Sequence, residues 1–104
     1  MDRIDEIRKE IDFIDNQLLR LFNERASLAI DLGQIKKEKG LDIYDPDREL
    51  GIIEMMFNQN EGPLDEKAVR GLFQRVIDES RWVEKFSVSE EETAETKTIK
   101  REIK

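Results

Sequence analysis

The sequence contains neither cysteine nor histidine. Without cysteine the chain has no disulfide bonds and no thiolate chemistry. Without histidine it lacks the commonest metal ligand and the commonest general base. We recognise no signal peptide and no apolar run long enough to span a bilayer, so we expect a cytoplasmic protein with no membrane partner.

Charged residues make up 41% of the 104 residues, and hydrophobic residues only 38%. The length allows one domain at most. A single copy of so polar a chain would bury little apolar surface, so we expect it to associate. The formal charge of −7 argues against nucleic acid as a partner, because phosphate binding needs a basic field. A small anion held in a local basic pocket remains compatible with this charge.

The first third of the chain carries a heptad pattern of apolar residues, with one position taken by Arg25. The apolar positions are Ile4, Ile7, Ile11, Ile14, Leu18, Leu21, Leu28, Leu32 and Ile35. We predict a helix over residues 2–39 that ends at Gly40, a residue able to adopt the left-handed conformation. Such a helix is about 55 Å long, and the rest of the chain is too short to cover it, so we predict a second copy.

Two further helices are predicted, which makes the fold all-α with three helices per chain. Asp45 and Pro46 are typical of a helix start, and this helix should reach about residue 57. A turn follows over residues 58–63, and Asp65 should cap a third helix. The apolar stripe of this helix, expected to face inward, is Val69, Leu72, Phe73, Val76, Ile77, Val83 and Phe86. Residues 87–104 are polar and lack an apolar face, so we expect a frayed or disordered tail after a helical domain over residues 1–86.

Arg25 and Lys36 are polar residues on one face of the long helix. They are eleven residues apart, close to three turns, so their Cα atoms are about 16 Å apart along the axis. Two long side chains leaning toward each other would hold a small ligand between them. Taken singly, Arg25 is better explained by snorkelling or by fixing the register. Lys36 is better explained as a cation favoured at a helix C-terminus.

Two more polar groups fall on single helix faces. Asp45, Arg48 and Glu49 share a face at the start of the second helix, where a cap and a surface ion pair are the simpler explanation. Ser80 and Glu84 continue the apolar row of the third helix, which indicates either a polar cavity or an exposed helix end.

Arg8 lies about 25 Å from Arg25 and about 42 Å from Lys36 along a straight helix, so it cannot reach their site in its own chain. In an antiparallel pair of long helices, with the two-fold axis near Leu18 and Leu19, the Arg8 of one chain reaches the gap between Arg25 and Lys36 of the other. The spacing therefore fits an antiparallel homodimer in which each chain lends its Arg8 to the other.

The ordered polar and apolar pattern resembles the all-helical chorismate mutases over roughly residues 3–86. The matching positions are Ile7, Arg8, Ile14, Asp15, Leu18, Leu19, Leu21, Arg25, Ala29, Gly33, Lys36, Asp45, Arg48, Glu49, Leu72, Phe73, Ser80 and Glu84. The resemblance implies a three-helix subunit in an intertwined dimer that converts chorismate to prephenate, on the route to phenylalanine and tyrosine, without metal or cofactor.

The same resemblance implies roles for individual residues. Arg8 of the partner chain and Arg25 would pair with the two substrate carboxylates, and Lys36 would contact a carboxylate and the ether oxygen. Glu49 would fix the ring hydroxyl, helped by Asp45 and oriented by the charge of Arg48. Ser80 would help hold the ring-carboxylate end. Glu84 would face the ether oxygen, where a carboxyl group donates a hydrogen bond only when it is protonated.

Three alternatives remain at this stage. An isochorismate-pyruvate lyase has the same fold and much of the same cationic set. A regulatory helical domain, associated with another shikimate-pathway enzyme, is suggested by residues 60–64, which resemble versions fused to the enzyme that opens the pathway. A coiled-coil adaptor without activity would bind no transition-state mimic and would tolerate Arg25→Leu.

Overall fold

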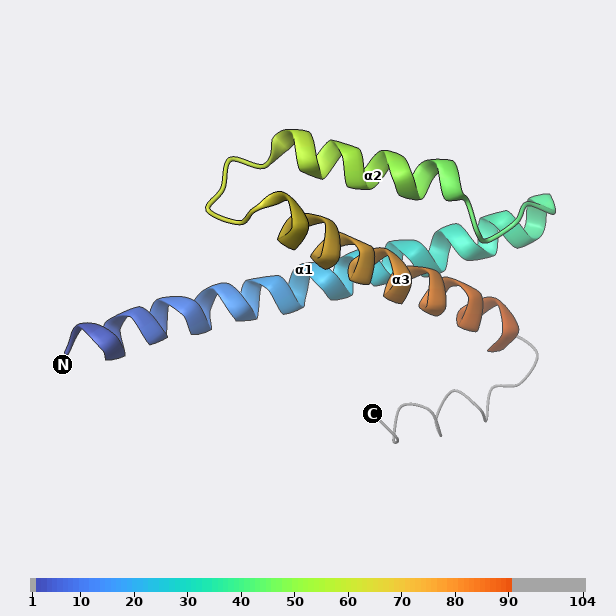
Figure 1. Ribbon diagram of the computed structural model, residues 1–104. Coiled ribbons are helices and arrows are strands. Elements are labelled where there is room, and N and C mark those ends of the chain that lie inside the picture. The colour runs from blue at the N-terminus through green and yellow to red at the C-terminus, as the bar shows by residue number, and fades with distance from the viewer. Residues whose placement is uncertain (1, 91–104) are drawn as a thin grey trace.

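The computed structural model describes residues 2–90, with side chains up to residue 86. These residues form three helices and no strand: α1 (Arg3–Lys39), α2 (Pro46–Gln59) and α3 (Glu66–Glu90). The long α1 runs diagonally across the molecule, α3 crosses its C-terminal half, and α2 lies on the other side of α3 (Figure 1). The predicted all-α fold with three helices is confirmed.

Both ends of α1 lie at the residues where the sequence predicts them. The carboxylate of Asp2 accepts a hydrogen bond from the backbone N–H of Asp5 at 2.9 Å, which caps the N-terminus. Gly40 ends the helix with a φ of 69°, a conformation that a residue without Cβ adopts at no steric cost. The predicted bounds of this helix are therefore confirmed.

The starts of α2 and α3 are also capped by aspartates. Asp45 accepts from the N–H of Arg48 at 3.1 Å, and Asp65 accepts from the N–H of Ala68 at 2.8 Å. Helix α2 extends two residues beyond its predicted end. Helix α3 continues to Glu90, so the first four residues of the predicted tail are helical. The remainder of that tail, residues 91–104, lies outside the described residues.

The core of the described chain is small and centred on α3. Helix α3 packs against α1 and α2, and four hydrophobic residues are buried: Ala29, Ile53, Val69 and Ile77. Leu72 was predicted to face inward with them but is 55% exposed, because neither α1 nor α2 of this chain covers it.

The N-terminal part of α1 projects beyond the other helices (Figure 1). Every residue from 2 to 24 is exposed. The exposed apolar side chains of this segment are Ile4, Ile7, Ile11, Phe13, Ile14, Leu18, Leu19, Leu21 and Phe22. The apolar stripe on which the prediction of a second copy depends is thus left uncovered by this chain. None of the described helices combines the length and the hydropathy needed to cross a membrane.

Candidate active site

A cavity of about 240 Å³ opens between the C-terminal half of α1, the start of α2 and the middle of α3. Its polar lining residues are Arg25, Lys36, Asp45, Arg48, Glu49, Ser80, Arg81 and Glu84. Seven of these eight were singled out from the sequence as site residues. The exception is Arg81. The cavity thus gathers residues from 25 to 84 of the chain into one place.

Arg25 enters the cavity from the heptad position at which the sequence breaks its apolar pattern. The side chain is half-buried, and one Nη atom donates a hydrogen bond to the Ser80 hydroxyl on α3. Because this partner is neutral, the hydrogen bond does not balance the charge of the guanidinium. A cation placed in this way favours an anionic ligand.

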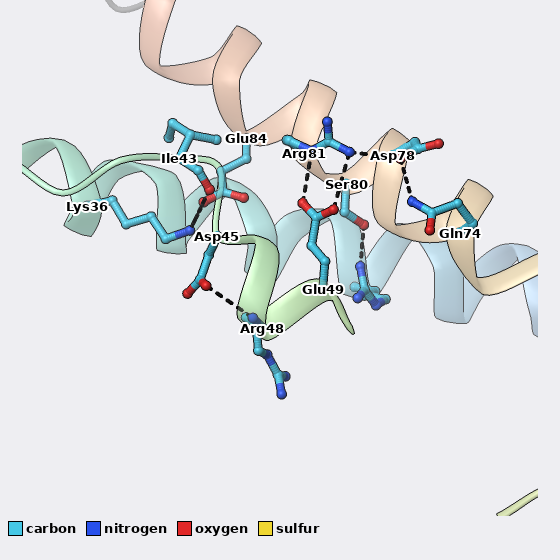
Figure 2. A network of polar contacts seen from close by, with 11 residues as sticks. Lys36, Ile43, Asp45, Arg48, Glu49, Gln74, Asp78, Ser80, Arg81 and Glu84 are labelled. Atoms are coloured by element: carbon cyan, nitrogen blue, oxygen red, sulfur yellow. Dashed lines mark hydrogen bonds and ion pairs between the residues drawn. The ribbon is translucent and has the colours of Figure 1, made fainter. Parts of the chain in front are cut away.

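Lys36 and Glu84 form a buried ion pair at the far end of the cavity. The Lys36 Nζ lies 3.0 Å from a carboxylate oxygen of Glu84, and the two side chains are only 14% and 8% exposed. Lys36 also donates to the backbone carbonyl of Ile43 at 2.9 Å, which holds the ammonium toward α3 (Figure 2). The same Glu84 oxygen accepts no hydrogen bond of good geometry, so its contact with Lys36 is an ion pair without a hydrogen bond.

The third group lies at the start of α2. Asp45 caps this helix, as predicted, and Glu49 points toward α3 (Figure 2). Arg48 was expected to orient Glu49, but its side chain is exposed and directed away from that carboxylate (Figure 2). The ion-pair partner of Glu49 is Arg81 instead, at 3.0 Å. The cause is geometric, since α3 faces the carboxylate from the side opposite to the Arg48 side chain.

Arg81 is the site residue that sequence reasoning missed. It follows the buried Ile77 by four residues, so it lies on the inward face of α3 beside Ser80 and Glu84. That spacing was the available signal. It was overlooked because an arginine three residues after Asp78 is typical of an exposed helix ion pair.

Arg8 lies outside this cavity in its own chain. It is exposed on the projecting part of α1, and it is absent from the residues that line the cavity. This position agrees with the helical distance that separates it from Arg25. The contribution of Arg8 to a site in a second copy stays a prediction.

The arrangement suits a small anion with more than one acidic group. The cationic residues that line the cavity outnumber the acidic ones: Arg25, Lys36, Arg48 and Arg81 against Asp45, Glu49 and Glu84. Two of the cations are already paired with acids, which leaves Arg25 and Arg48 for ligand charges. A cavity of this kind can position a flexible ligand and stabilise negative charge that develops on it.

Residues 7–85 match the family model for chorismate mutase type II. The chain is 37% identical over 91 residues to a chorismate mutase from Methanocaldococcus jannaschii, covering 86% of this chain and 92% of that protein. It is 40% identical over 81 residues to a bifunctional chorismate mutase/prephenate dehydratase from Aquifex aeolicus, covering 74% of this chain. The match spans only 22% of that bifunctional relative.

A solved structure shares the fold. The chorismate mutase from Helicobacter pylori in complex with prephenate superposes with a TM-score of 0.77 at 29% sequence identity. The superposition covers 84% of this chain and 94% of that one.

Proposed function

The chain belongs to the chorismate mutase type II family, and from this membership we propose that it catalyses the rearrangement of chorismate to prephenate. The substrate carries two carboxylates, and the cavity has more cationic than acidic residues. The observation that carries the proposal is the half-buried Arg25 guanidinium, whose hydrogen-bond partner in this chain is the neutral Ser80 hydroxyl. A ligand carboxylate supplies the missing negative charge.

The reaction requires no nucleophile and no co-reactant. One carbon–oxygen bond of the enolpyruvyl ether breaks as one carbon–carbon bond forms, and the electrons move within the substrate. The protein has to hold a flexible molecule in a compact chair and stabilise the negative charge that builds on the ether oxygen. Even the low end of enzymatic rate acceleration requires about 8 kcal/mol of barrier reduction, which fixed cations in a water-poor cavity can supply.

Most polar residues of the cavity receive a role from this chemistry. Arg25 pairs with one substrate carboxylate, and Ser80 holds the ring-carboxylate end. Lys36 contacts a carboxylate and the ether oxygen. Glu49 accepts a hydrogen bond from the ring hydroxyl, with Asp45 in support. The buried position of Lys36 and the half-buried positions of Arg25 and Glu49 support these roles.

Glu84 has two states in this scheme. Without substrate, the ammonium of Lys36 balances its negative charge across 3.0 Å. A bound dianion draws Lys36 toward its own carboxylate and ether oxygen, so an ionised Glu84 would then face developing negative charge. Glu84 therefore acts as a protonated hydrogen-bond donor to the ether oxygen.

The site is completed by a second copy of the chain. Arg8 of the partner supplies a further guanidinium for the substrate carboxylates, and the two long helices pair antiparallel. The uncovered apolar stripe of α1 supports this assembly, because its exposed side chains are typical of an interface rather than of a free surface. The fused relatives support an association with another shikimate-pathway enzyme.

The test is an assay of the purified chain with chorismate, in which the loss of substrate absorbance is followed and the product is identified. We expect saturable consumption of chorismate with prephenate as the product. Isochorismate is assayed in parallel, because salicylate and pyruvate from that substrate would assign a lyase instead. Absence of turnover with chorismate, in a folded dimeric chain, would contradict the proposal.

A further inference from the structure

Arg81 connects three separate parts of the chain through a single guanidinium. Its Nε and Nη2 atoms donate to the two carboxylate oxygens of Glu49 on α2, at 3.0 and 3.4 Å. The Nη2 atom also donates to Asp78 on α3 at 2.8 Å. The guanidinium carbon lies 5.1 Å from the ring centroid of Tyr44, in the loop between α1 and α2. Figure 2 shows Arg81 between Glu49 and Asp78.

This geometry fixes the direction of the Glu49 carboxylate. The planar fork of an arginine matches both oxygens of a carboxylate, so it constrains orientation as well as charge. The Glu49 side chain is 18% exposed and that of Arg81 34%, so the pair is partly shielded from water. Asp78 and Tyr44 hold the guanidinium itself, which leaves it few alternative positions.

We propose that Arg81 is a positioning residue that sets the specificity of the site for a ligand hydroxyl group, acting through Glu49. This inference rests on the proposed function, in which Glu49 receives the ring hydroxyl of the substrate. Arg81 already donates to both Glu49 oxygens, so the free lone pairs of the carboxylate point in a defined direction. A ligand hydroxyl in that direction donates a hydrogen bond to Glu49. A ligand without the hydroxyl gains no affinity from the orientation of Glu49.

The alternative is that Arg81 touches the ligand itself, since it lines the cavity. Direct contact and positioning through Glu49 predict different effects of Arg81 on the binding of ligands with and without the hydroxyl. A guanidinium that binds a ligand carboxylate contributes equally to ligands with and without the hydroxyl. A guanidinium that orients Glu49 contributes only when the hydroxyl is present.

The experiment measures dissociation constants for a bicyclic dicarboxylate mimic of the transition state, prepared with and without its ring hydroxyl. Wild type, Arg81→Met and Arg81→Lys are compared, and circular dichroism melting checks that each is folded. Arg75→Met is the matched control, because Arg75 forms an exposed ion pair with Glu79 on the same helix. The last two variants are Glu49→Gln alone and Glu49→Gln combined with Arg81→Met.

We expect Arg81→Met to weaken binding of the hydroxylated mimic by about tenfold, as for loss of one charged hydrogen bond, and to leave the other mimic unaffected. Arg81→Lys keeps the charge without the fork, so it should give an intermediate loss. Arg75→Met should change neither constant. In the Glu49→Gln background the effect of Arg81→Met should disappear.

Two results would overturn the inference in different ways. Equal losses for both mimics in folded Arg81→Met and Arg81→Lys would show direct contact with the ligand, and the proposed function would stand. A wild-type chain that binds neither mimic would remove the proposed function, and this inference with it.

Discussion

Single residues of the site could be predicted where they break an apolar row. Arg25, Ser80 and Glu84 lie at positions that the helix pattern reserves for hydrophobic side chains, and all three line the cavity. Each has a simpler explanation when taken singly, but together they point to a polar cavity, because burying a polar group without a partner is costly. Arg81 could not be assigned in the same way. Its partner Glu49 is 32 residues away in the sequence, and only the packing of α2 on α3 brings the two together.

The Glu84 side chain gives a prediction at this scale. A carboxyl group donates a hydrogen bond to the ether oxygen only when it is protonated, whereas a glutamine amide donates at every pH. Glu84→Gln should therefore keep a hydrogen-bond donor at the ether oxygen and retain kcat/KM for chorismate. Glu84→Leu, which has no donor, should lose about tenfold or more. The measurement is kcat/KM for the two variants and for wild type.

Equal losses in Glu84→Gln and Glu84→Leu would refute this role of Glu84. Glu79→Gln serves as the control, because Glu79 is exposed on the same helix and forms an ion pair with Arg75. That variant should keep the wild-type kcat/KM.

Helices were predictable to the extent that their signals are local. The aspartate caps and Gly40 lie within a few residues of the ends that they define, so the sequence contains what is needed to place those ends. The exposure of Leu72 and of the apolar stripe on α1 depends on which neighbours are present. The apolar pattern of the sequence does not show which residues are covered, since an apolar stripe can face either its own chain or a second one.

The crossing of α1 and α3 depends on Gly33. A Cβ built at this position would lie 2.7 Å from the Cγ of Glu84 and 2.9 Å from its backbone carbonyl oxygen. The backbone cannot yield without moving α3, so Gly33→Ala should push the Glu84 end of α3 away from α1. We expect a loss of about 1–3 kcal/mol in the free energy of unfolding, as for overpacking, together with a fall in kcat.

The control for this prediction is Gly71→Ala on α3, where an added Cβ would meet nothing within 4 Å. Because alanine has the higher helix propensity, that variant should gain up to about 1 kcal/mol. Both free energies come from chemical denaturation, and kcat comes from the chorismate assay. A Gly33→Ala variant as stable and as active as wild type would contradict a tight contact at this crossing.

At the scale of the whole molecule, the proposed assembly makes the chain half of a unit. Four hydrophobic residues are buried in the described part, while nine large ones between residues 4 and 22 are exposed. A core this small gives little stability, and the apolar surface left on α1 is available for a partner. The length of α1 predicts a second copy, and the spacing of Arg8 from Arg25 predicts an antiparallel pairing. Both stay predictions, because one chain contains no contact between two copies.

Mixing two inactive variants tests directly whether the site is shared between chains. Arg8→Ala and Arg25→Leu should each be nearly inactive as homodimers, because every site lacks one guanidinium. After the two are unfolded together and refolded in equal amounts, about half of the dimers contain one chain of each kind. In those dimers both lesions fall in one site and the other site is intact, so about a quarter of wild-type activity should return. If Arg8 instead serves its own chain, every site keeps a lesion and the refolded mixture stays as inactive as its parents.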